Sequence, residues 1–484
     1  MIRFVMDGRL RTLENCDPTQ TVLEWLREEE NRTGTKEGCA EGDCGACTVA
    51  LGDLVDGKVR YRAINACIVF LPMLHGRELV TVESIGSSKA MHPVQQAMVD
   101  NHGSQCGFCT PGFIMSLFAR YQDSDAALPS SANTVLAGNL CRCTGYGPIQ
   151  QSAEEVVPDP SIQNRFGGPD TIKLLQKIAD EPAGELRFSD AAFQTERLGY
   201  VPVTEASLAD LLTAHPDATV VAGATDVGLW VTKALKNLET VIFLGNINSL
   251  QTVDETDAGL KIGAGVKYSD ALSVLSALHT DIGALLTRLG SVQVRNSGTI
   301  GGNIANGSPI GDTPPILIAL DATLTLGSAN GERSLALEDF FIDYGKQDLR
   351  PGEYVKSVTV PPITSDVVFR TYKISKRFDQ DISAVCAAFA IKVSGGIVQS
   401  ARIAFGGMAP TPKRAAACEM ALSGKPWTLE TVEQACAEMA KDYTPITDMR
   451  ASADYRLKVA QNLLKKAFLE ATGKTRTRIL EAQA

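Results

Sequence analysis

Cysteine is the residue that most constrains this chain. The sequence contains 12 cysteines, and eight of them are concentrated between residues 39 and 143. No basic and apolar leader precedes them, so we expect a cytoplasmic protein, and a reducing compartment disfavours a disulfide framework. The eight clustered thiols therefore need another role. The remaining four stand alone and are expected to be ordinary core or surface thiols: Cys16, Cys386, Cys418 and Cys436.

The first four clustered cysteines have an informative spacing. They follow the pattern Cys-x4-Cys-x2-Cys, and the last comes after nineteen further residues: Cys39, Cys44, Cys47 and Cys67. Plant-type proteins use this pattern to hold a [2Fe-2S] cluster through four thiolates. Glycines would let the backbone wrap closely around such a cluster, at Gly38, Gly42 and Gly45. A structural zinc site is the alternative, but zinc ribbons favour two short Cys-x2-4-Cys pairs, and this segment has one.

The other four clustered cysteines form two short pairs. A Cys-x2-Cys pair precedes a predicted helix, and a Cys-x-Cys pair begins 32 residues after it, beyond a helix-like stretch: Cys106, Cys109, Cys141 and Cys143. Helix N-termini beside these thiolates would offset part of their negative charge. The spacing alone leaves three interpretations open, namely a second iron-sulfur cluster, a zinc knuckle and a redox dithiol.

The sequence around these cysteines predicts short local elements. Asp7-Gly8 indicates a hairpin within residues 2–15, and Thr21 with Glu24 forms a capping box at the start of a helix. Together with Gln105, directly before the second set, the cysteine segments resemble the iron-sulfur portion of the molybdenum hydroxylases, the xanthine oxidase family. The resemblance implies a ferredoxin-like β-grasp domain over residues 1–84 and a helical bundle over 85–158, each with one [2Fe-2S] cluster. It also implies that Gln105 contacts the molybdopterin of a partner subunit.

Two glycine-rich stretches follow a predicted linker over residues 159–195, for which one helix near 171–179 is expected. A strand over 219–222 runs into a glycine turn and a helix-like segment, which can present backbone amides to a phosphate. A second glycine-rich stretch over 297–312 is expected to be a loop that a ligand approaches closely. Taken singly, each stretch is more typical of a tight turn. No Gly-x-Gly-x-x-Gly fingerprint or P-loop occurs, which argues against a Rossmann or P-loop site.

Together, the two stretches resemble the FAD domain of the same family, of the vanillyl-alcohol oxidase type, here expected over residues 196–364. The resemblance implies FAD contacts at Val220, Val221, Ala222, Gly223, Ala224, Thr225, Asp226, Val227, Thr299, Ile300, Gly301, Gly302, Asn303, Asp312, Val355 and Lys373. Leu289 stands where the family usually has an aromatic FAD contact. An α+β C-terminal flavoprotein domain is expected over 365–484, with closing helices over 429–441 and 453–471.

The resemblance also implies a nicotinamide site. Tyr344 matches a tyrosine that contacts NAD in the family, and residues 376–381 match a loop beside the flavin. Read alone, the charges of this loop are typical of a solvated surface segment. The loop carries Phe378 as its apolar residue.

Overall, we expect an α+β multidomain protein. The net charge of -10 argues against nucleic acid as a partner, and no apolar run is long enough to span a membrane. The order of the parts resembles the xanthine dehydrogenases of the family. This implies a small subunit that passes electrons from a large molybdenum-binding subunit, through the second and then the first cluster, to FAD and NAD+, during oxidation of hypoxanthine or xanthine to urate in an (αβ)2 heterotetramer.

Two alternatives use the same chain. The partner subunit could make it part of an aldehyde or N-heterocycle hydroxylase, because the substrate pocket is expected in that subunit. The chain could also act without a molybdenum partner, as a free-standing NADH diaphorase or electron-transfer module.

Overall fold

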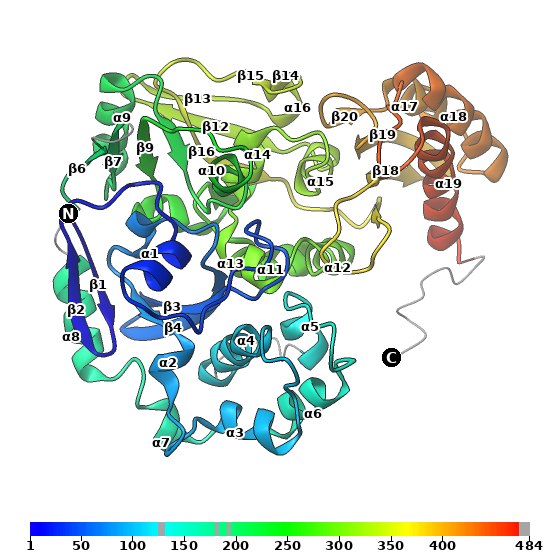
Figure 1. Cartoon of the computed structure of the whole chain (residues 1–484). Helices are drawn as coiled ribbons and strands as arrows, with labels where there is room; N and C mark the ends of the chain where they lie inside the picture. The colour runs from blue at the N-terminus through cyan, green and yellow to red at the C-terminus, as the bar shows by residue number, and fades with distance from the viewer. Residues whose placement is uncertain (124–130, 180–182, 191–194, 474–484) are drawn as a thin grey trace. The chain divides into compact units, whose positions relative to one another are not determined.

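The computed structural model describes residues 1–123, 131–179, 183–190 and 195–473. The chain forms two compact units, and each is described here by itself (Figure 1). The first unit comprises Met1–Ser249 together with Gly290–Thr299. The second comprises Leu250–Leu289 together with the described residues from Ile300 onward.

The first unit begins with a sheet in the order β2-β1-β5-β3-β4, in which β1 and β5 are parallel and the other pairs antiparallel. The predicted hairpin is confirmed, since Met6 pairs with Arg9. The capping box is confirmed as well, because the Thr21 hydroxyl accepts from Glu24 N while the Glu24 carboxylate accepts from Thr21 N. The elements are β1 (Ile2–Met6), β2 (Arg9–Leu13), α1 (Val22–Glu28), β3 (Thr48–Val55), β4 (Lys58–Asn65), η1 (Leu71–Leu74) and β5 (Glu78–Val80).

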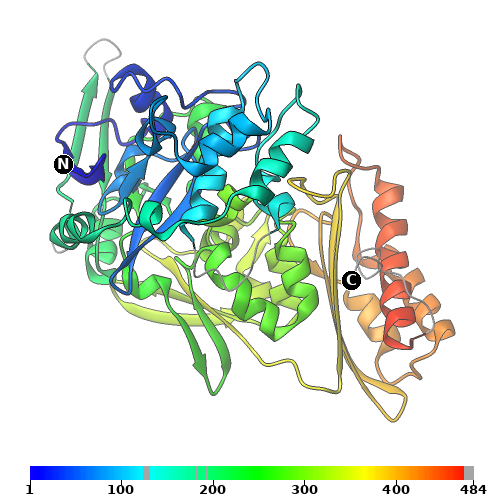
Figure 2. The same ribbon diagram turned by 90° about the horizontal axis from the view of Figure 1, so that it is seen from below.

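A helical region packs on this sheet. The longest helix of the region, α4, lies against β3 and β4 and buries Phe113 and Phe118 (Figure 2). The region contains α2 (Val82–Ile85), α3 (Pro93–Asp100), α4 (Thr110–Gln122), α5 (Ala132–Leu136) and α6 (Gly147–Glu155). The described part of the predicted linker holds α7 (Pro160–Gln163) and a strand, β6 (Leu186–Asp190), in addition to the expected helix, α8 (Pro169–Ala179). The strand was not expected, and it pairs with the first strand after the linker. Asp159 explains the extra turn, because its carboxylate caps α7 at Ser161 N.

The first unit continues with a sheet in the order β6-β7-β9-β8, in which β9 is parallel to both neighbours. Parallel pairing of β8 and β9 requires a crossover, and α10 supplies it. The elements are β6 (Leu186–Asp190), β7 (Thr195–Tyr200), α9 (Glu205–Ala214), β8 (Thr219–Val221), α10 (Val227–Thr232) and β9 (Thr240–Phe243). Helix α13 (Val292–Ser297) also belongs to this unit and packs on β4.

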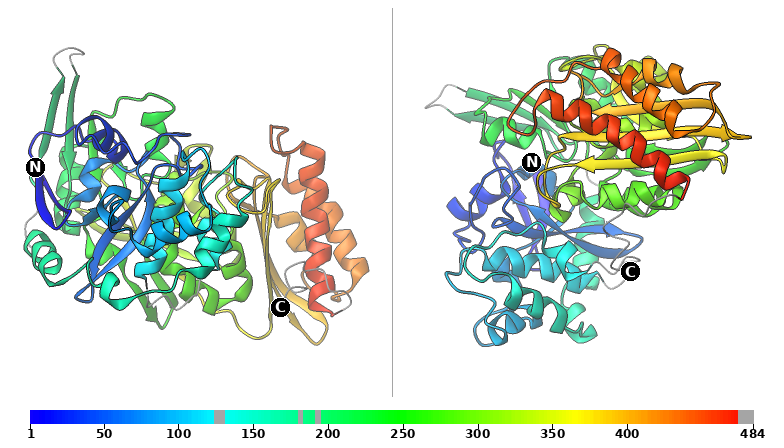
Figure 3. Two further views of the ribbon diagram at one scale, coloured as in Figure 1. Left: turned by 60° about the horizontal axis from the view of Figure 1, so that its bottom comes forward. Right: turned by 90° about the vertical axis from the view of Figure 1, so that its right-hand side faces the viewer.

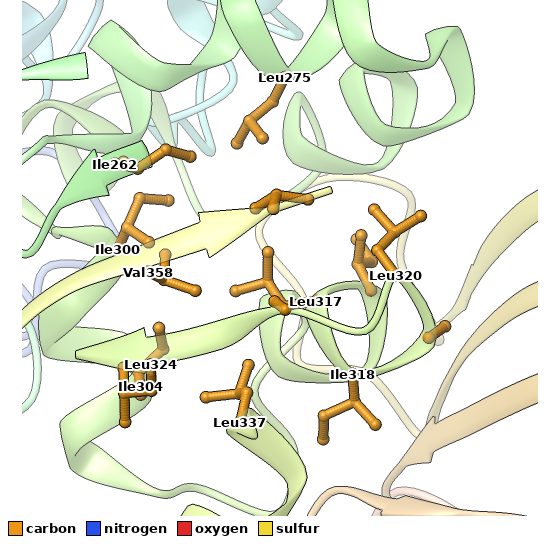
Figure 4. Packing of buried hydrophobic residues seen from close by; sticks show 14 of the residues in the cluster. Ile262, Leu275, Ile300, Ile304, Leu317, Ile318, Leu320, Leu324, Leu337 and Val358 are labelled. Atoms are coloured by element: carbon orange, nitrogen blue, oxygen red, sulfur yellow. The ribbon is translucent and has the colours of Figure 1, made fainter. Parts of the chain in front are cut away.

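The second unit contains a sheet in the order β10-β11-β16-β12-β13, with helices around a large apolar core. Ile262, Ile300, Leu324 and Val358 are fully buried in this core (Figure 4). After η2 (Asn248–Gln251), the elements are β10 (Val253–Thr256), β11 (Gly259–Gly263), α11 (Tyr268–Leu278), α12 (Thr280–Leu286), α14 (Ile300–Asn306), α15 (Thr313–Ala319), β12 (Thr323–Ser328), β13 (Gly331–Ala336), α16 (Leu337–Phe340), β14 (Phe341–Asp343), β15 (Lys346–Gln347) and β16 (Tyr354–Val360).

An antiparallel sheet in the order β17-β18-β19-β20 ends the second unit, and α17, α18 and α19 cover one face of it (Figure 3). The two closing helices predicted from the sequence are confirmed as α18 and α19. The elements are β17 (Val367–Ile374), β18 (Val385–Ser394), β19 (Ile397–Gly406), β20 (Lys413–Arg414), α17 (Ala416–Leu422), α18 (Leu429–Asp442) and α19 (Ala453–Ala471).

The isolated cysteines are core residues. Cys16, Cys386, Cys418 and Cys436 are all buried, and burial raises the pKa of Cys16 and of Cys436 to about 11. Thiols with such high pKa values stay protonated and unreactive at neutral pH. A separate observation concerns the membrane: among the described helices, none combines the length and the apolar composition that a membrane span requires.

Candidate functional site

The first cysteine set surrounds the open end of the β3–β4 hairpin. Cys47 directly precedes β3 and Cys67 follows β4, so the pairing of Thr48 with Asn65 brings these two cysteines to the same end. Cys39 and Cys44 lie in the loop that leads into β3. The Cys39 sulfur accepts hydrogen bonds from Asp43 N at 3.4 Å and from Cys44 N at 3.3 Å. These amides are oriented to stabilise a thiolate, as an iron-sulfur cluster requires.

The four thiols of this set contact one another in the order Cys44, Cys39, Cys67, Cys47. Hydrogen bonds with Cys44 and then with Cys67 lower the pKa of Cys39. The hydrogen bond with Cys39, followed by burial, raises the pKa of Cys44. Contacts with Cys39 and then with Cys47 raise the pKa of Cys67. The structure thus brings all four predicted ligands of the first set together.

The glycines predicted to wrap this site are required by space or by backbone conformation. A Cβ on Gly38 would lie 2.8 Å from the Cys44 sulfur. Gly42 and Gly45 have φ angles of +78° and +71°, a region that favours glycine. Ala40 also has a positive φ, 53°, which the sequence did not indicate. The Ala40 carbonyl accepts from the Thr232 hydroxyl at 2.8 Å, so α10 holds this loop.

The second cysteine set lies at helix starts, as predicted. Cys109 is the N-cap residue of α4, and Cys141 and Cys143 lie in the turn before α6. The thiols form two contacting pairs, Cys109 with Cys141 and Cys106 with Cys143. Burial, followed by the hydrogen bond with Cys141, raises the pKa of Cys109 to about 12. Cys106 and Cys143 are exposed, and so is Gln105.

The grouping of the thiols fits a two-iron cluster. Such a cluster takes four cysteine thiolates, two at each iron, so its ligands are spread over two metal centres. A structural zinc ion instead gathers its four ligands around one point. In both sets the thiols contact one another, which brings four candidate thiolates together as a two-iron cluster requires.

The first predicted FAD stretch is a tight turn between β8 and α10. A Cβ on Gly223 would lie 1.9 Å from Ser297 O and 2.9 Å from the Gly298 Cα. Only glycine therefore fits at this position, and the turn lies directly against the start of the second glycine-rich stretch. Ala224 has a φ of +58°, which completes the turn. The structure thus brings together the two segments that the sequence separates by about 75 residues.

The second glycine-rich stretch differs from the expected loop, because residues 300–306 form helix α14. The glycines serve close packing: a Cβ on Gly301 would lie 2.3 Å from the Ala264 Cβ. The Asn303 side-chain oxygen is buried and has no hydrogen-bond partner among the residues that the structure describes. A buried polar atom of this kind is what a hydrogen-bonding ligand such as FAD would satisfy, so the residues present fit that cofactor.

Four further residues of the predicted FAD site lie in the second unit. Lys373 Nζ donates to the Asp312 carboxylate at 2.5 Å and to the Ser383 hydroxyl at 3.0 Å, and all three residues are buried. Val355 is buried in β16, whereas Leu289 is partly exposed beside the apolar core. The pair of Asp312 and Lys373 is hydrogen-bonded as a buried ion pair must be. Ser383, which completes it, could not be recognised from its sequence context.

The two predicted nicotinamide features are surface features. Tyr344 lies in the turn between β14 and β15 and is 74% exposed. Residues 376–381 form a loop without regular structure, as expected. Arg288 holds this loop, because its guanidinium donates to Phe378 O at 3.1 Å and lies 4.5 Å from the centre of the Phe378 ring. No sequence pattern indicates this contact, since the two residues are 90 positions apart.

Comparisons with known proteins agree with this organisation. Four family models match consecutive parts of the chain. They are a 2Fe-2S iron-sulfur cluster binding domain over residues 4–71, a [2Fe-2S] binding domain over 81–154, an FAD binding domain in molybdopterin dehydrogenase over 192–363, and a CO dehydrogenase flavoprotein C-terminal domain over 370–471.

Individual relatives point the same way. Xanthine dehydrogenase of Emericella nidulans is 32% identical over 91% of this chain, which spans 36% of that protein. Aldehyde oxidase 1 of Bos taurus is 30% identical over 96% of this chain and 39% of its own length. Among solved structures, a carbon monoxide dehydrogenase from Hydrogenophaga pseudoflava that lacks the Mo-pyranopterin moiety of its cofactor covers 57% of this chain and 98% of its own, with 29% identity and a TM-score of 0.54. The chain spans just over a third of the length of the curated relatives that it matches. With its two [2Fe-2S] domains, its FAD-binding domain and its C-terminal flavoprotein domain, the chain belongs to the molybdenum hydroxylase family.

Proposed function

We propose that this chain is the electron-transferring subunit of a xanthine dehydrogenase, and that it relays electrons from a molybdenum centre in a separate large subunit to NAD+. The observation that carries the proposal is the presence, in one chain, of a set of four contacting cysteines, a set of two contacting cysteine pairs, and a flavin segment built around Gly223. When bound, the clusters would supply single-electron steps and FAD would supply the change to two-electron chemistry.

The residues of the chain would hold and orient these groups. Cys39, Cys44, Cys47 and Cys67 would hold one cluster, and Cys106, Cys109, Cys141 and Cys143 the other. The Asp43 and Cys44 amides donate to the Cys39 sulfur, which lowers the cost of a negative charge there. On the flavin side, residues 220–227 and 299–303 would contact FAD, with Asn303 as a hydrogen-bond partner. Leu289, Asp312, Val355 and Lys373 would complete that site.

We also propose the domain boundaries given by the sequence. They are 1–84 and 85–158 for the two cluster domains, 159–195 for the linker, 196–364 for the FAD domain and 365–484 for the C-terminal flavoprotein domain. The limits of the four family models support this division. The two compact units, the first of which includes α13 together with the cluster domains, are a further level of organisation.

The surface around the second cysteine set supports a partner subunit on that side. Cys106 and Cys143 are exposed, and apolar side chains beside them are exposed as well: Phe108, Leu140 and Tyr146. A cluster held by exposed thiols is open to solvent unless another protein covers it, and apolar surface favours such a cover. Gln105 lies on the same segment, where it would contact the pterin of the large subunit. An (αβ)2 heterotetramer is the assembly we propose.

The experiment that tests this function uses the chain with and without its partner. The purified chain should contain about four irons and about four acid-labile sulfides, and one FAD. It should reduce artificial acceptors with NADH but fail to oxidise xanthine, whereas the complex with the large subunit should oxidise xanthine. Xanthine turnover by this polypeptide alone would contradict the two-subunit arrangement. Zinc in place of labile sulfide would contradict the cluster assignment.

The nicotinamide site has its own test in the complex. Tyr344→Ala should raise the apparent KM for NAD+ and leave FAD content and reduction by xanthine unchanged, because the side chain would contact only the nicotinamide cofactor. Tyr455→Ala is the matched control, since Tyr455 is also exposed but lies on α19. An unchanged KM would remove Tyr344 from the site. Oxygen reduction as fast as NAD+ reduction in the wild type would instead favour an oxidase.

A second substrate class follows from one comparison. The similarity to aldehyde oxidase 1 extends over 96% of this chain at 30% identity, close to the values for xanthine dehydrogenase. Because the substrate pocket would lie in the large subunit, the same chain could serve an aldehyde or N-heterocycle hydroxylase, as the alternative function. Assay of the complex with xanthine, an aromatic aldehyde and quinoline separates these substrates. A free-standing diaphorase is supported if no large subunit copurifies with the chain.

A further inference from the structure

The two cysteine segments of the first unit touch each other through their backbones. Leu140 N, directly before Cys141, donates to Cys44 O at 2.9 Å. A Cβ on Gly45 would lie 2.1 Å from Gly138 O, and a Cβ on Gly112 would lie 2.2 Å from Gly45 O. No side chain fits in these places. The peptide after Cys44 is therefore packed directly between the start of α4 and the segment that carries Cys141.

A buried polar network surrounds this peptide. The Asn139 side-chain amide donates to Gly45 O at 3.0 Å and lies 3.3 Å from the Thr48 hydroxyl. The Asn139 oxygen accepts from the Ser116 hydroxyl at 2.6 Å, and the Thr48 hydroxyl donates to Gly45 O at 2.6 Å. Asn139, Thr48 and Ser116 are each at most 2% exposed. Asn139 thus links the first cysteine segment, the second cysteine segment and α4.

Gln293 on α13 completes the network from a distant part of the sequence. Its amide nitrogen lies 3.2 Å from the Thr48 hydroxyl, 3.1 Å from the Ser116 hydroxyl and 3.1 Å from the Asn139 oxygen. The side chain is 1% exposed, and its oxygen has no hydrogen-bond partner in the part of the chain that the structure describes. An unpaired buried oxygen costs free energy, and an apolar side chain of similar size would avoid that cost. The part of Gln293 that serves the site is therefore its amide nitrogen, which donates to the surrounding oxygens.

We propose that Gln293 and Asn139 are positioning residues for electron transfer between the two clusters. They hold the Cys44–Gly45 peptide against Leu140 and thereby fix the separation of the two cysteine sets. Hydrogen bonds in a buried environment of low dielectric constant are stronger than in water, which suits a fixed separation. Each transfer moves one electron from one cluster to the other, so that one is oxidised and the other is reduced. No bond or proton changes place in the network. This inference rests on the proposed function, because it requires both clusters.

The test uses the full-length protein loaded with iron, sulfide and FAD. We would compare the wild type with Gln293→Met and Asn139→Leu, which keep the side-chain size and remove the hydrogen bonds. Two quantities are measured: the magnetic coupling between the two reduced clusters in EPR spectra, and the rate at which the clusters equilibrate after flash reduction by a deazaflavin. Both variants should keep both EPR signals, show weaker coupling and equilibrate several-fold more slowly.

The matched control is Asn296→Leu. Asn296 is also a buried amide on α13, but it donates to Ala63 O in β4 and lies outside the network around Gly45. In Asn296→Leu, electrons should equilibrate between the two clusters at the wild-type rate. A second comparison uses Thr48→Ser, which keeps the hydroxyl, and Thr48→Val, which removes it. Thr48→Ser should restore wild-type coupling and rate, whereas Thr48→Val should resemble Gln293→Met.

The outcomes separate this inference from the proposed function. Unchanged coupling and rate in Gln293→Met and Asn139→Leu, with both signals present, would overturn the positioning role and leave the function standing. If Gln293→Met lost iron while the other variants kept it, the positioning role would also be overturned, because Gln293 would then be needed to retain a cluster. Absence of either cluster signal from the wild-type protein would contradict the proposed function itself.

Discussion

The two cysteine sets differ in how far the chain encloses them. In the first set, Cys47 and Cys67 are each 2% exposed, and α10 holds the neighbouring loop through Thr232. In the second set, Cys106 and Cys143 lie at the surface. The first set is thus enclosed by its own hairpin and by a helix from later in the chain. The difference indicates that this chain alone encloses much of the first cysteine set, whereas the second set leaves exposed thiols that a partner protein can cover.

The largest expected effect comes from removing one ligand of each set. Cys67→Ser should abolish the EPR signal of the first cluster and lower the stability of the sheet domain, because the residue is in its core. Cys143→Ser should abolish only the second signal and leave unfolding of the sheet domain unchanged, since the side chain is exposed. EPR spectra, iron content and thermal unfolding measure these effects. Loss of both signals from Cys143→Ser would contradict the separation of the two sets.

The second effect concerns two buried groups, one in each domain, whose contributions to stability depend on pH in opposite directions. Glu78 in β5 is buried, and burial raises its pKa to about 7. The folded domain keeps this proton, so the contribution of Glu78 to stability is full below about pH 4.5 and is lost as the pH rises through about 7. His92 at the start of α3 is also buried, and burial, followed by Arg165, lowers its pKa to about 4. The contribution of His92 to the helical domain is therefore full above about pH 6.5 and is lost as the pH falls through about 4. His75 gives the sheet domain a second contribution of this kind, because burial also lowers its pKa to about 4.

Each of these shifts corresponds to about 3 kcal/mol at the extremes of pH. Visible circular dichroism of each cluster during urea unfolding, from pH 5 to pH 8 in steps, would follow the two domains separately. Glu78→Gln should remove the loss of stability that the first domain shows as the pH rises through about 7, and leave the second domain unchanged. His92→Asn keeps an acceptor for Val94 N, which His92 Nδ1 now provides, and should flatten only the pH profile of the second domain. A pH profile left unchanged by both substitutions would contradict the two pKa shifts.

The third effect concerns access of small molecules. An iron chelator should remove iron from the second cluster several-fold faster than from the first in the isolated chain, because exposed thiolates admit competing ligands. The large subunit should remove most of this difference by covering the second set. Absorbance of the chelate, with EPR to identify the remaining cluster, measures the order of loss. Equal rates in the isolated chain would show that exposure does not control access.

The smallest effect comes from the helix caps beside the two sets. Thr21→Ala should lower the free energy of unfolding of the first domain by about 1 kcal/mol, because it removes a buried, reciprocal capping box. Ser131→Ala removes the cap of the short helix α5, where the hydroxyl accepts from Thr134 N at the surface. Its effect on the second domain should be smaller. If Ser131→Ala lowered the free energy of unfolding more than Thr21→Ala does, the exposed cap would matter more than the buried one, which would contradict this order of effects.

The features predicted from the sequence are those with local signals. Asp7-Gly8, the Thr21 capping box, and the apolar periodicity of α18 and α19 each lie within a few residues, and each is confirmed. The cysteine sets were recognised for the same reason. Helix α14 was missed because glycine usually disfavours a helix, and only its packing on Ala264 explains Gly301.

The contacts that sequence reasoning missed join residues far apart in the chain. Gln293 and Asn139 are separated by 154 positions, and Arg288 and Phe378 by 90. No spacing rule connects such residues. A sequence also does not show whether a glutamine is buried or exposed. The role of Gln293 becomes visible only in the structure, where the hydroxyl groups around it can be seen.

The membership of α13 in the first unit limits how this protein can be divided. A polypeptide that ended at Ser249 would contain every clustered cysteine, yet it would lack the helix from which Asn296 donates to Ala63 O and Gln293 reaches the hydroxyl groups of Thr48 and Ser116. The relay is therefore not a simple tandem of independent modules. If this chain were divided after Ser249 into two products, the second product would have to supply this helix, so that assembly of the two products would become part of folding the first.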